Sequence, residues 1–184
     1  HLRRQRQMCI RDRNKTDVPV PKAYIHCEDE SVIGTEFFLM SFVDGEVMWE
    51  PHIPQASNEE RQKIYHSMNE TIAMLHSVDH ESIGLETFGK PGNYVGRQVA
   101  RWSKQYVASE TREIKSMNNL MEWLPKNLPA EKATKLVHGD FSLSNVMIDL
   151  KTFKICAILD WELSTLGDPC LLYTSDAADE GVRV

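Results

Sequence analysis

Three polar residues in the last third of the chain have types and spacings that suit phosphoryl transfer. Asp140 and Asn145 stand in the order D-x-x-x-x-N, and Asp160 follows after a turn and a continuous apolar segment. Phosphoryl transfer needs an acid that accepts the proton of the attacking hydroxyl, and oxygen ligands that hold magnesium against the phosphates. Asp140 fits the first role, and Asn145 and Asp160 fit the second. The pattern therefore predicts an ATP-dependent kinase of small molecules.

The triplet His138-Gly139-Asp140 allows a second interpretation. An ordinary turn also uses such residues, with Asp140 accepting backbone N–H groups and His138 packed beneath it. We interpret His138 as structural in either case, and Gly139 as a residue that removes side-chain bulk where a substrate must approach. A metal-dependent hydrolase built on His138, Asp140 and Asp160 lacks the further His ligands that it would need. Three polar residues on either side of a hairpin favour the kinase.

Short strands must hold these residues in place. Three apolar runs are predicted to be β-strands: Leu136–Val137, Val146–Ile148 and Ile155–Leu159. The last two are separated by Asp149–Phe153, a length that suits a hairpin turn. Asp140 then lies on the loop after the first strand, Asn145 lies at the foot of the second, and Asp160 ends the third.

The upstream part of the chain predicts two more strands and three helices. The strands are Ala23–Cys27 and Thr35–Val43, and the bulky apolar side chains of the second indicate that it is buried. The segments with helical periodicity are Ser57–Val78, Tyr94–Val107 and Ile114–Leu124. Ser57 and Glu60 form a capping box at the first of them. The glycine-rich residues 84–96 lack Walker-A or G-x-G-x-x-G spacing, so we interpret them as a surface loop.

The composition is that of an ordinary globular protein, with 41% hydrophobic and 26% charged residues among 184. A formal net charge of -6 provides no electrostatic footprint for nucleic acid. No run approaches the roughly 20 apolar residues of a membrane-spanning helix, so no membrane span is predicted. Four scattered cysteines without zinc-ligand spacing favour a reducing compartment. We expect an intracellular protein, cytoplasmic by default, with a mitochondrial or peroxisomal location left open.

The central motifs are similar to those of a known family. His138-Gly-Asp-Phe-Ser-Leu-Ser-Asn145, followed by Ile158-Leu-Asp-Trp-Glu162, resembles the aminoglycoside phosphotransferase/choline kinase-like family. Leu159-Asp-Trp-Glu-Leu-Ser-Thr-Leu-Gly-Asp-Pro169 especially resembles the branch found as the N-terminal kinase domain of acyl-CoA dehydrogenase family members 10 and 11. The resemblance covers roughly residues 18–170. It implies an α+β, protein-kinase-like fold with a truncated N-lobe, a hinge, and a partial helical C-lobe that carries a catalytic β-hairpin.

The resemblance also implies roles for residues and ligands. It makes Asp140 the catalytic base, assigns Mg²⁺ to Asn145 and Asp160, and turns Leu39–Val43 into the hinge between the lobes. Backbone groups of Ser41 and Val43 would bond the adenine of ATP, and Met40 would line the base pocket. The acceptor is a small-molecule hydroxyl, which the dehydrogenase-linked branch narrows to a hydroxyacyl-CoA. That branch further implies a covalently linked acyl-CoA dehydrogenase domain.

The departures from the family predict an incomplete domain. Residues 1–17 are expected to be an unstructured tail of foreign sequence, and residues 171–184 a tail outside the family. Residues 18–170 form the partial phosphotransferase domain, with 18–45 as N-lobe remnant and hinge and 46–170 as C-lobe. Nothing before Val18 resembles the family's phosphate-binding Lys, so this fragment is expected to be inactive alone. The alternative is a catalytically silent binding or scaffold module with the kinase-like fold.

Overall fold

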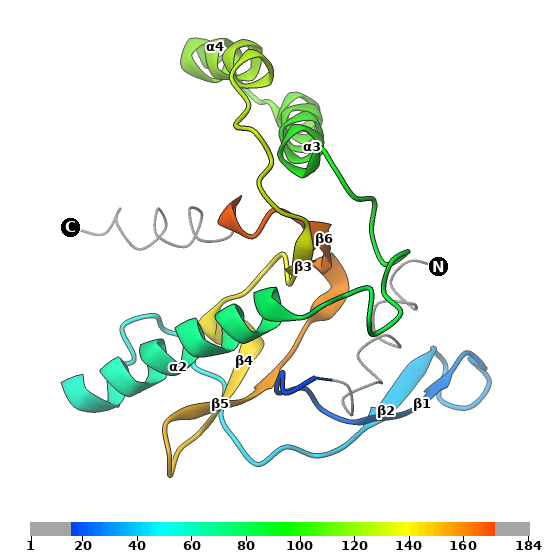
Figure 1. Cartoon of the computed structure of the whole chain (residues 1–184), viewed down its shortest axis with the longest axis vertical. Coiled ribbons are helices and arrows are strands. Elements are labelled where there is room, and N and C mark those ends of the chain that lie inside the picture. The colour runs from blue at the N-terminus through cyan, green and yellow to red at the C-terminus, as the bar shows by residue number, and fades with distance from the viewer. Residues whose placement is uncertain (1–15, 172–184) are drawn as a thin grey trace.

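The computed structural model describes residues 16–171 and has a mixed α+β architecture (Figure 1). Its helices and strands follow one another as β1 Ala23–Cys27, β2 Phe37–Met40, α2 Asn58–Ser77, α3 Tyr94–Ser109, α4 Lys115–Trp123, β3 Lys135–Val137, β4 Val146–Asp149, β5 Lys154–Ile158 and β6 Thr165–Gly167. Short 3₁₀ turns occupy Leu124–Lys126, Leu143–Asn145 and Trp161–Leu163. The predicted tails lie outside this range, except for residues 16, 17 and 171.

The strands pair into three antiparallel two-stranded sheets, β1 with β2, β3 with β6, and β4 with β5. The predicted hairpin is confirmed as β4–β5, which we call the catalytic hairpin after the role that the family resemblance predicts for it. Helix α2 runs along it and packs against β5 and β3 (Figure 1). The centre of the core consists of fully buried side chains from both elements: Ile64 and Leu75 of α2, and Val146, Ile148 and Ile158 of the hairpin.

Helix α2 confirms the capping box and the helical periodicity. The Glu60 N–H donates to Ser57 Oγ at 3.3 Å, and the Ser57 N–H donates to the Glu60 carboxylate at 2.8 Å. These bonds satisfy two backbone donors that a helix start leaves without partners. Further along, Ser67 Oγ accepts the Ile155 N–H at 2.9 Å in a buried contact, so the helix is joined to β5 by a hydrogen bond as well as by packing.

The catalytic hairpin contains an irregularity in β5. Met147 pairs with Ala157 whereas Ile148 pairs with Ile155, which leaves Cys156 as the extra residue of a β-bulge. A bulge of this kind bends and twists a strand locally. The Cys156 thiol donates to the Met147 carbonyl oxygen at 3.3 Å. The apolar pattern predicted the strand, and the bulge shifts the register within it.

The β1–β2 ribbon corrects the prediction of a buried strand at Thr35–Val43. The strand is confined to Phe37–Met40, and its side chains are partly or largely exposed, with Leu39 at 56% and Met40 at 44%. The reason is that, among residues 16–171, β2 pairs only with β1 and no helix covers the ribbon (Figure 1). The neighbouring prediction, a strand at Ala23–Cys27, is confirmed residue for residue.

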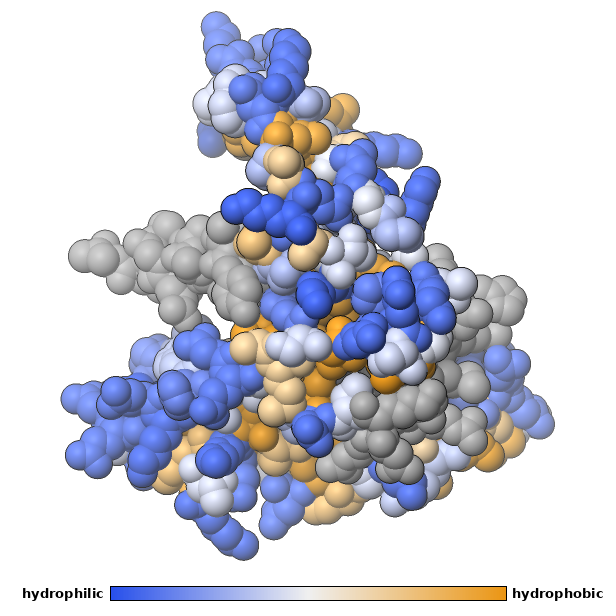
Figure 2. Space-filling view, viewed as in Figure 1, coloured by the Kyte–Doolittle hydropathy of each residue, from blue (hydrophilic) through white to orange (hydrophobic). Residues whose placement is uncertain are grey.

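Helices α3 and α4 project from the rest of the molecule (Figure 1). The apolar residues behind their predicted periodicity remain partly exposed, with Trp102 at 57% and Leu120 at 42%, and Figure 2 shows hydrophobic residues among hydrophilic ones on this projection. Tyr94, the first residue of α3, is the exception, because its ring packs against Gly167 of β6. Among the described residues no helix is long and apolar enough to cross a membrane.

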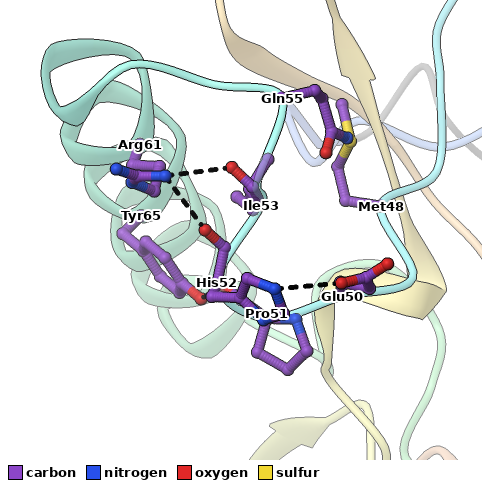
Figure 3. A network of polar contacts seen from close by, with 8 residues as sticks. All are labelled: Met48, Glu50, Pro51, His52, Ile53, Gln55, Arg61 and Tyr65. Atoms are coloured by element: carbon purple, nitrogen blue, oxygen red, sulfur yellow. Dashed lines mark hydrogen bonds and ion pairs between the residues drawn. The ribbon is translucent and has the colours of Figure 1, made fainter.

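A loop between the ribbon and α2 is fastened to the helix (Figure 3). The Arg61 guanidinium donates to the carbonyl oxygens of His52 at 3.2 Å and Ile53 at 3.1 Å, and the Tyr65 hydroxyl donates to the Pro51 carbonyl at 2.5 Å. Ile53 is fully buried and has a positive φ of 40°. The path from the ribbon into the helical part is therefore fixed by side-chain contacts.

Candidate active site

The loop of residues 138–145, which we call the catalytic loop after its predicted role, brings Asp140 and Asn145 into direct contact. The Asn145 Nδ2 group donates to Asp140 Oδ2 at 2.9 Å and to the Asp140 carbonyl oxygen at 2.8 Å. Because both acceptors are oxygens, only the NH₂ end of the amide can face them, and Asn145 Oδ1 is left for another partner. The D-x-x-x-x-N spacing thus closes into a contact between the two side chains.

Asp160 lies at the end of the catalytic hairpin where Asn145 is found. The Leu159 N–H donates to the Asn145 carbonyl oxygen at 2.8 Å, which extends the pairing one step beyond β4 and β5. Asp160 is the next residue, with an exposed side chain and a left-handed backbone at φ 54° and ψ 62°. Asp tolerates this conformation better than most residues because its short polar side chain bonds locally. The structure therefore gathers all three predicted residues.

His138 joins the two acid-bearing segments from within the core. Its side chain is fully buried, its Nε2 lies 2.8 Å from the Leu159 carbonyl oxygen, and its Nδ1 accepts the Asp140 N–H at 3.3 Å. A backbone N–H can only donate, so Nδ1 carries no proton, and Nε2 carries the proton that it donates to Leu159. The ring is therefore held as the neutral tautomer with Nε2 protonated. This geometry supports the structural role expected for His138.

The surroundings of His138 agree with a neutral ring. Burial is the largest influence and lowers the pKa of His138, while the bond to Leu159 and the nearby carboxylates of Asp140 and Asp160 oppose that shift. The edges of two aromatic rings enclose the imidazole, with centroid distances of 4.9 Å to Trp161 and 6.1 Å to Phe141.

Gly139 is required by the structure for reasons that sequence reasoning did not give. We expected it to leave room for a substrate, but a Cβ at this position would lie 2.5 Å from the Leu163 carbonyl oxygen. The residue also has a positive φ of 86°, which favours glycine. Close packing of the loop against the 3₁₀ turn Trp161–Leu163 and the backbone conformation both require glycine here. A glycine within the turn-like triplet His-Gly-Asp is the sequence signal that could have indicated a left-handed backbone here.

Sequence reasoning missed β6 and the residues beside it. β6 pairs with β3 and thereby fixes the strand from which the catalytic loop departs. Just after β6, the buried Asp168 carboxylate accepts the backbone N–H of Cys170 at 2.9 Å and that of Lys132 at 3.4 Å. Asp168 lies in the Gly-Asp-Pro segment quoted for the family resemblance, but no role was predicted for it.

The residues present fit Mg²⁺ by donor chemistry. Mg²⁺ prefers oxygen ligands and commonly takes one or two from the protein, with water and phosphate completing its shell. Asp160 offers an exposed carboxylate and Asn145 offers its Oδ1 atom, because its nitrogen is occupied by Asp140. These two protein oxygens suit a metal that also binds phosphates. Within residues 16–171 no group of three His, Cys, Asp or Glu side chains is arranged to hold a metal ion.

The predicted adenine-binding residues lie at the end of β2. The Ser41 N–H donates to the Lys22 carbonyl oxygen at 2.8 Å, and Ser41 Oγ accepts the Lys22 N–H at 2.9 Å. In the range 16–171, the Ser41 carbonyl and the Val43 N–H make no hydrogen bond to another residue. Met40 is half exposed. Ser41 and Val43 are partly exposed, and the binding of adenine by these groups stays a prediction.

Comparison with known proteins places the chain in a family. The family model described as "Phosphotransferase enzyme family" matches residues 3–171. The match begins within the predicted N-terminal tail, and the division into tail and domain stays a prediction. Acyl-CoA dehydrogenase family member 10 of Mus musculus is 45% identical over 163 residues, and member 11 of Homo sapiens is 46% identical over 152. The match covers 85% and 82% of this chain, but only 15% and 20% of those relatives.

Solved structures give the same result for the fold. A candidate aminoglycoside phosphotransferase of Ralstonia eutropha is 51% identical with a TM-score of 0.81, covering 91% of this chain and 51% of that one. The streptomycin–ATP complex of APH(2")-IIa has a TM-score of 0.67 at 18% identity, covering 93% and 61% respectively. The second likeness shows a shared fold, and confirms the predicted kinase-like architecture. By its motifs, its fold and the extent of the family match, the chain belongs to the phosphotransferase enzyme family, in which the aminoglycoside phosphotransferases are its structural neighbours.

Proposed function

We propose that this chain carries the base and the metal ligands of an ATP-dependent phosphotransferase that phosphorylates a hydroxyl group of a small molecule. One observation carries the proposal: Asn145 binds the Asp140 side chain while its backbone pairs with Leu159, next to Asp160. An acid, an amide and a second acid thus lie at one end of the hairpin, as in the phosphoryl-transfer template. The ATP named in the APH(2")-IIa structure is consistent with ATP as donor.

Asp140 acts as the base in this proposal. Its Oδ2 atom is held by the Asn145 amide, and the other carboxylate oxygen would receive the proton of the acceptor hydroxyl. As the acceptor oxygen forms its bond to the γ-phosphorus, the bond to the bridging oxygen of ADP breaks and the hydroxyl proton passes to Asp140. The hydrogen bond fixes the carboxylate and so reduces the loss of side-chain freedom when the acceptor binds.

Asn145 and Asp160 hold Mg²⁺ in this proposal. The cation supplies charge neutralisation for the phosphates when it is bound. Asn145 therefore acts at two points, because its nitrogen orients Asp140 and its oxygen binds the cation. The Ser41 carbonyl, the Val43 N–H and the Met40 side chain would receive the adenine base at the hinge.

The acceptor we propose is a hydroxyacyl-CoA. The support is the similarity to acyl-CoA dehydrogenase family members 10 and 11, whose names refer to acyl-CoA chemistry. We also propose that the chain is part of a longer protein with an acyl-CoA dehydrogenase domain, because it spans only 15–20% of those relatives. In that arrangement, phosphorylation converts the hydroxyl into a phosphate ester, whose phosphate is a better leaving group for a later reaction in another domain.

Calorimetric titration of MgATP against the full-length protein tests the proposal. The informative variant is Asp160→Asn, with Asp149→Asn as a matched control that removes a carboxylate from the turn of the same hairpin. We expect Asp160→Asn to weaken MgATP binding and abolish transfer to a hydroxyacyl-CoA, while Asp149→Asn retains both. Equal binding and turnover in the two variants would refute the assignment of the metal site. Binding of nucleotide without transfer to any hydroxyl would favour the silent scaffold.

A further inference from the structure

The candidate adenine-binding segment, Leu39–Val43, is connected to the catalytic hairpin by two chain segments that we call the legs. The first leg is Val18–Val20, which precedes β1, and the second is Asp44–Glu46, which follows the hinge segment. Each leg runs along one outer edge of the hairpin. The Ile158 N–H of β5 donates to the Pro19 carbonyl oxygen at 2.8 Å.

The second leg pairs with the opposite edge. The Glu46 N–H donates to the Ile148 carbonyl oxygen at 2.9 Å, and the Ile148 N–H donates back to the Glu46 carbonyl at 2.8 Å. Lys22 lies just after the first leg, and Ser41 lies just before the second. The two residues are joined by two hydrogen bonds, at 2.8 and 2.9 Å. The hydrogen bonds therefore form a closed circuit that contains both hairpin strands, both legs and Ser41.

Apolar packing supports this circuit on both sides. Val18 and Val20 of the first leg are buried, and so is Met48, just after the second leg. The second leg also lies directly against the bulge of β5, since a Cβ on Gly45 would come within 2.7 Å of the Cys156 Sγ and 3.0 Å of the Ile148 carbonyl oxygen. Buried apolar residues and a close backbone contact are features of segments that open only with the core around them.

We infer that the hinge segment and the catalytic hairpin form one rigid unit, in which the backbone of Glu46 and the contact between Gly45 and Cys156 position the nucleotide base relative to Asp160. Asp160 follows Ile158 by two residues, so one end of the circuit lies beside the metal ligand and the other contains the adenine-binding backbone. The inference rests on the proposed function for its consequence in catalysis, whereas the rigid unit rests on the hydrogen bonds and the packing of the two legs. The two ends of the site are then held together, and motion is confined to the ribbon residues outside Leu39–Val43.

Hydrogen exchange in the full-length protein tests the rigid unit without reference to activity. Glu46→Pro removes the N–H that pairs with Ile148, whereas Glu46→Ala keeps both backbone bonds and is the matched control, because the Glu46 side chain is exposed. We expect Glu46→Pro to speed exchange at Ser41 and Ile158 about tenfold or more, equivalent to the loss of one hydrogen bond. Glu46→Ala should exchange like the wild type. Unchanged exchange at Ser41 and Ile158 in Glu46→Pro would overturn the inference.

The kinetic consequence separates positioning from chemistry. In Glu46→Pro we expect the KM for MgATP to rise about tenfold, while kcat at saturating MgATP and the KM for the acceptor change by less than about threefold. A fall in kcat with an unchanged KM for MgATP would contradict the positioning role. If neither the wild type nor any variant binds MgATP, the proposed function fails, and the exchange experiment still decides whether the unit is rigid.

A second pair of variants examines the contact at the bulge. Gly45→Ala introduces a methyl group against the Cys156 thiol and should raise the KM for MgATP about threefold, and Cys156→Ala in the same chain should restore most of it. Gly45 has no positive φ, so the substitution tests space and not backbone strain. Additive effects of the two substitutions would show that this contact does not position the nucleotide.

Discussion

The catalytic hairpin and the β1–β2 ribbon are both antiparallel pairs of short strands, yet they are stabilised very differently. In the hairpin, Val146, Ile148 and Ile158 are fully buried beneath α2. In the ribbon, the strand Phe37–Met40 consists only of large apolar residues, and none of them is fully buried. The more apolar strand is thus the more exposed one. Burial in this chain depends on whether another element covers the strand, and not on the strand's own composition.

This difference coincides with a division of the candidate site. The proposed base and metal ligands lie at the end of the buried hairpin, where Asn145 binds the Asp140 side chain and pairs through its backbone with Leu159, next to Asp160. The adenine-binding groups lie at the end of the exposed ribbon. Since burying a Leu or Ile side chain contributes about 1.5–3 kcal/mol, the ribbon forgoes stabilisation that the hairpin receives. Substitutions at the two ends should therefore have different consequences.

The largest expected effect concerns chemistry at the hairpin end. Asp140→Asn removes the base but keeps a side chain of the same shape beside Asn145. We expect kcat for phosphoryl transfer to fall by about 10²–10⁴-fold, while the affinity for MgATP changes little, because general-base catalysis contributes an effect of that size. Steady-state kinetics and calorimetry on the full-length protein measure the two quantities. A similar loss from Met40→Ala, at the ribbon end, would show that the division of the site is wrong.

A pair of truncations compares the stability of the two sheets directly. Ile148→Ala in the hairpin should lower the local free energy of unfolding by about 2–5 kcal/mol, because it leaves a cavity in the core. Leu39→Ala in the ribbon should change it by less than about 0.5 kcal/mol, because the side chain is 56% exposed. Native-state hydrogen exchange of the amides in each sheet gives both values. Comparable losses would mean that the ribbon is covered in the full-length protein.

Two glycines with nearly the same backbone conformation sharpen the comparison. Gly139 and Gly34 have φ values of 86° and 87°, but a Cβ on Gly139 would meet the Leu163 carbonyl oxygen at 2.5 Å, whereas one on Gly34 meets nothing within 4 Å. Gly34→Ala should cost about 1 kcal/mol for the left-handed conformation alone. Gly139→Ala should cost more, about 2–4 kcal/mol, because the collision adds to that strain. Thermal unfolding of both variants makes the comparison, and equal losses would show that the catalytic loop can move away from Leu163.

The sequence predicted the local parts of this architecture well. The capping box of α2, the strand Ala23–Cys27 and the hairpin around Asp149–Phe153 each depend on residues close together in the chain, whose types select the structure directly. The D-x-x-x-x-N spacing of Asp140 and Asn145 is also local, although the direct contact between their side chains was not predicted. Short-range patterns of this kind are determined by backbone propensity and by hydrogen bonds between near neighbours.

The features that were not predicted depend on distant parts of the chain. The bond from His138 to Leu159 spans 21 residues, and β6 is a strand only because it pairs with β3. The prediction that the strand at Phe37–Met40 is buried was wrong. The sequence pattern shows how apolar a strand is, but burial also requires another element that covers the strand. Gly139 was interpreted as leaving room for a substrate, and its close packing against the distant Leu163 carbonyl group was not predicted.

The smallest expected effect is a pH dependence that originates at the hairpin end. Burial lowers the pKa of His138 in the folded protein, so between that value and its ordinary value of about 6.5 the unfolded chain binds a proton that the folded chain does not. The stabilisation is therefore fully present above about pH 6.5 and is lost as the pH falls through the folded pKa. His138→Gln removes the titrating ring and can keep a donor for the Leu159 carbonyl. We expect this variant to be less stable than the wild type at pH 7.5. In denaturant unfolding, its free energy of unfolding should decline less steeply between pH 7.5 and 5.

A second histidine provides the control. Burial also lowers the pKa of His76, so His76 should leave a residual pH dependence that His76→Gln removes in the double variant. An unchanged slope in His138→Gln would mean that the ring is not held neutral, and that the link between the catalytic loop and Leu159 tolerates a charge.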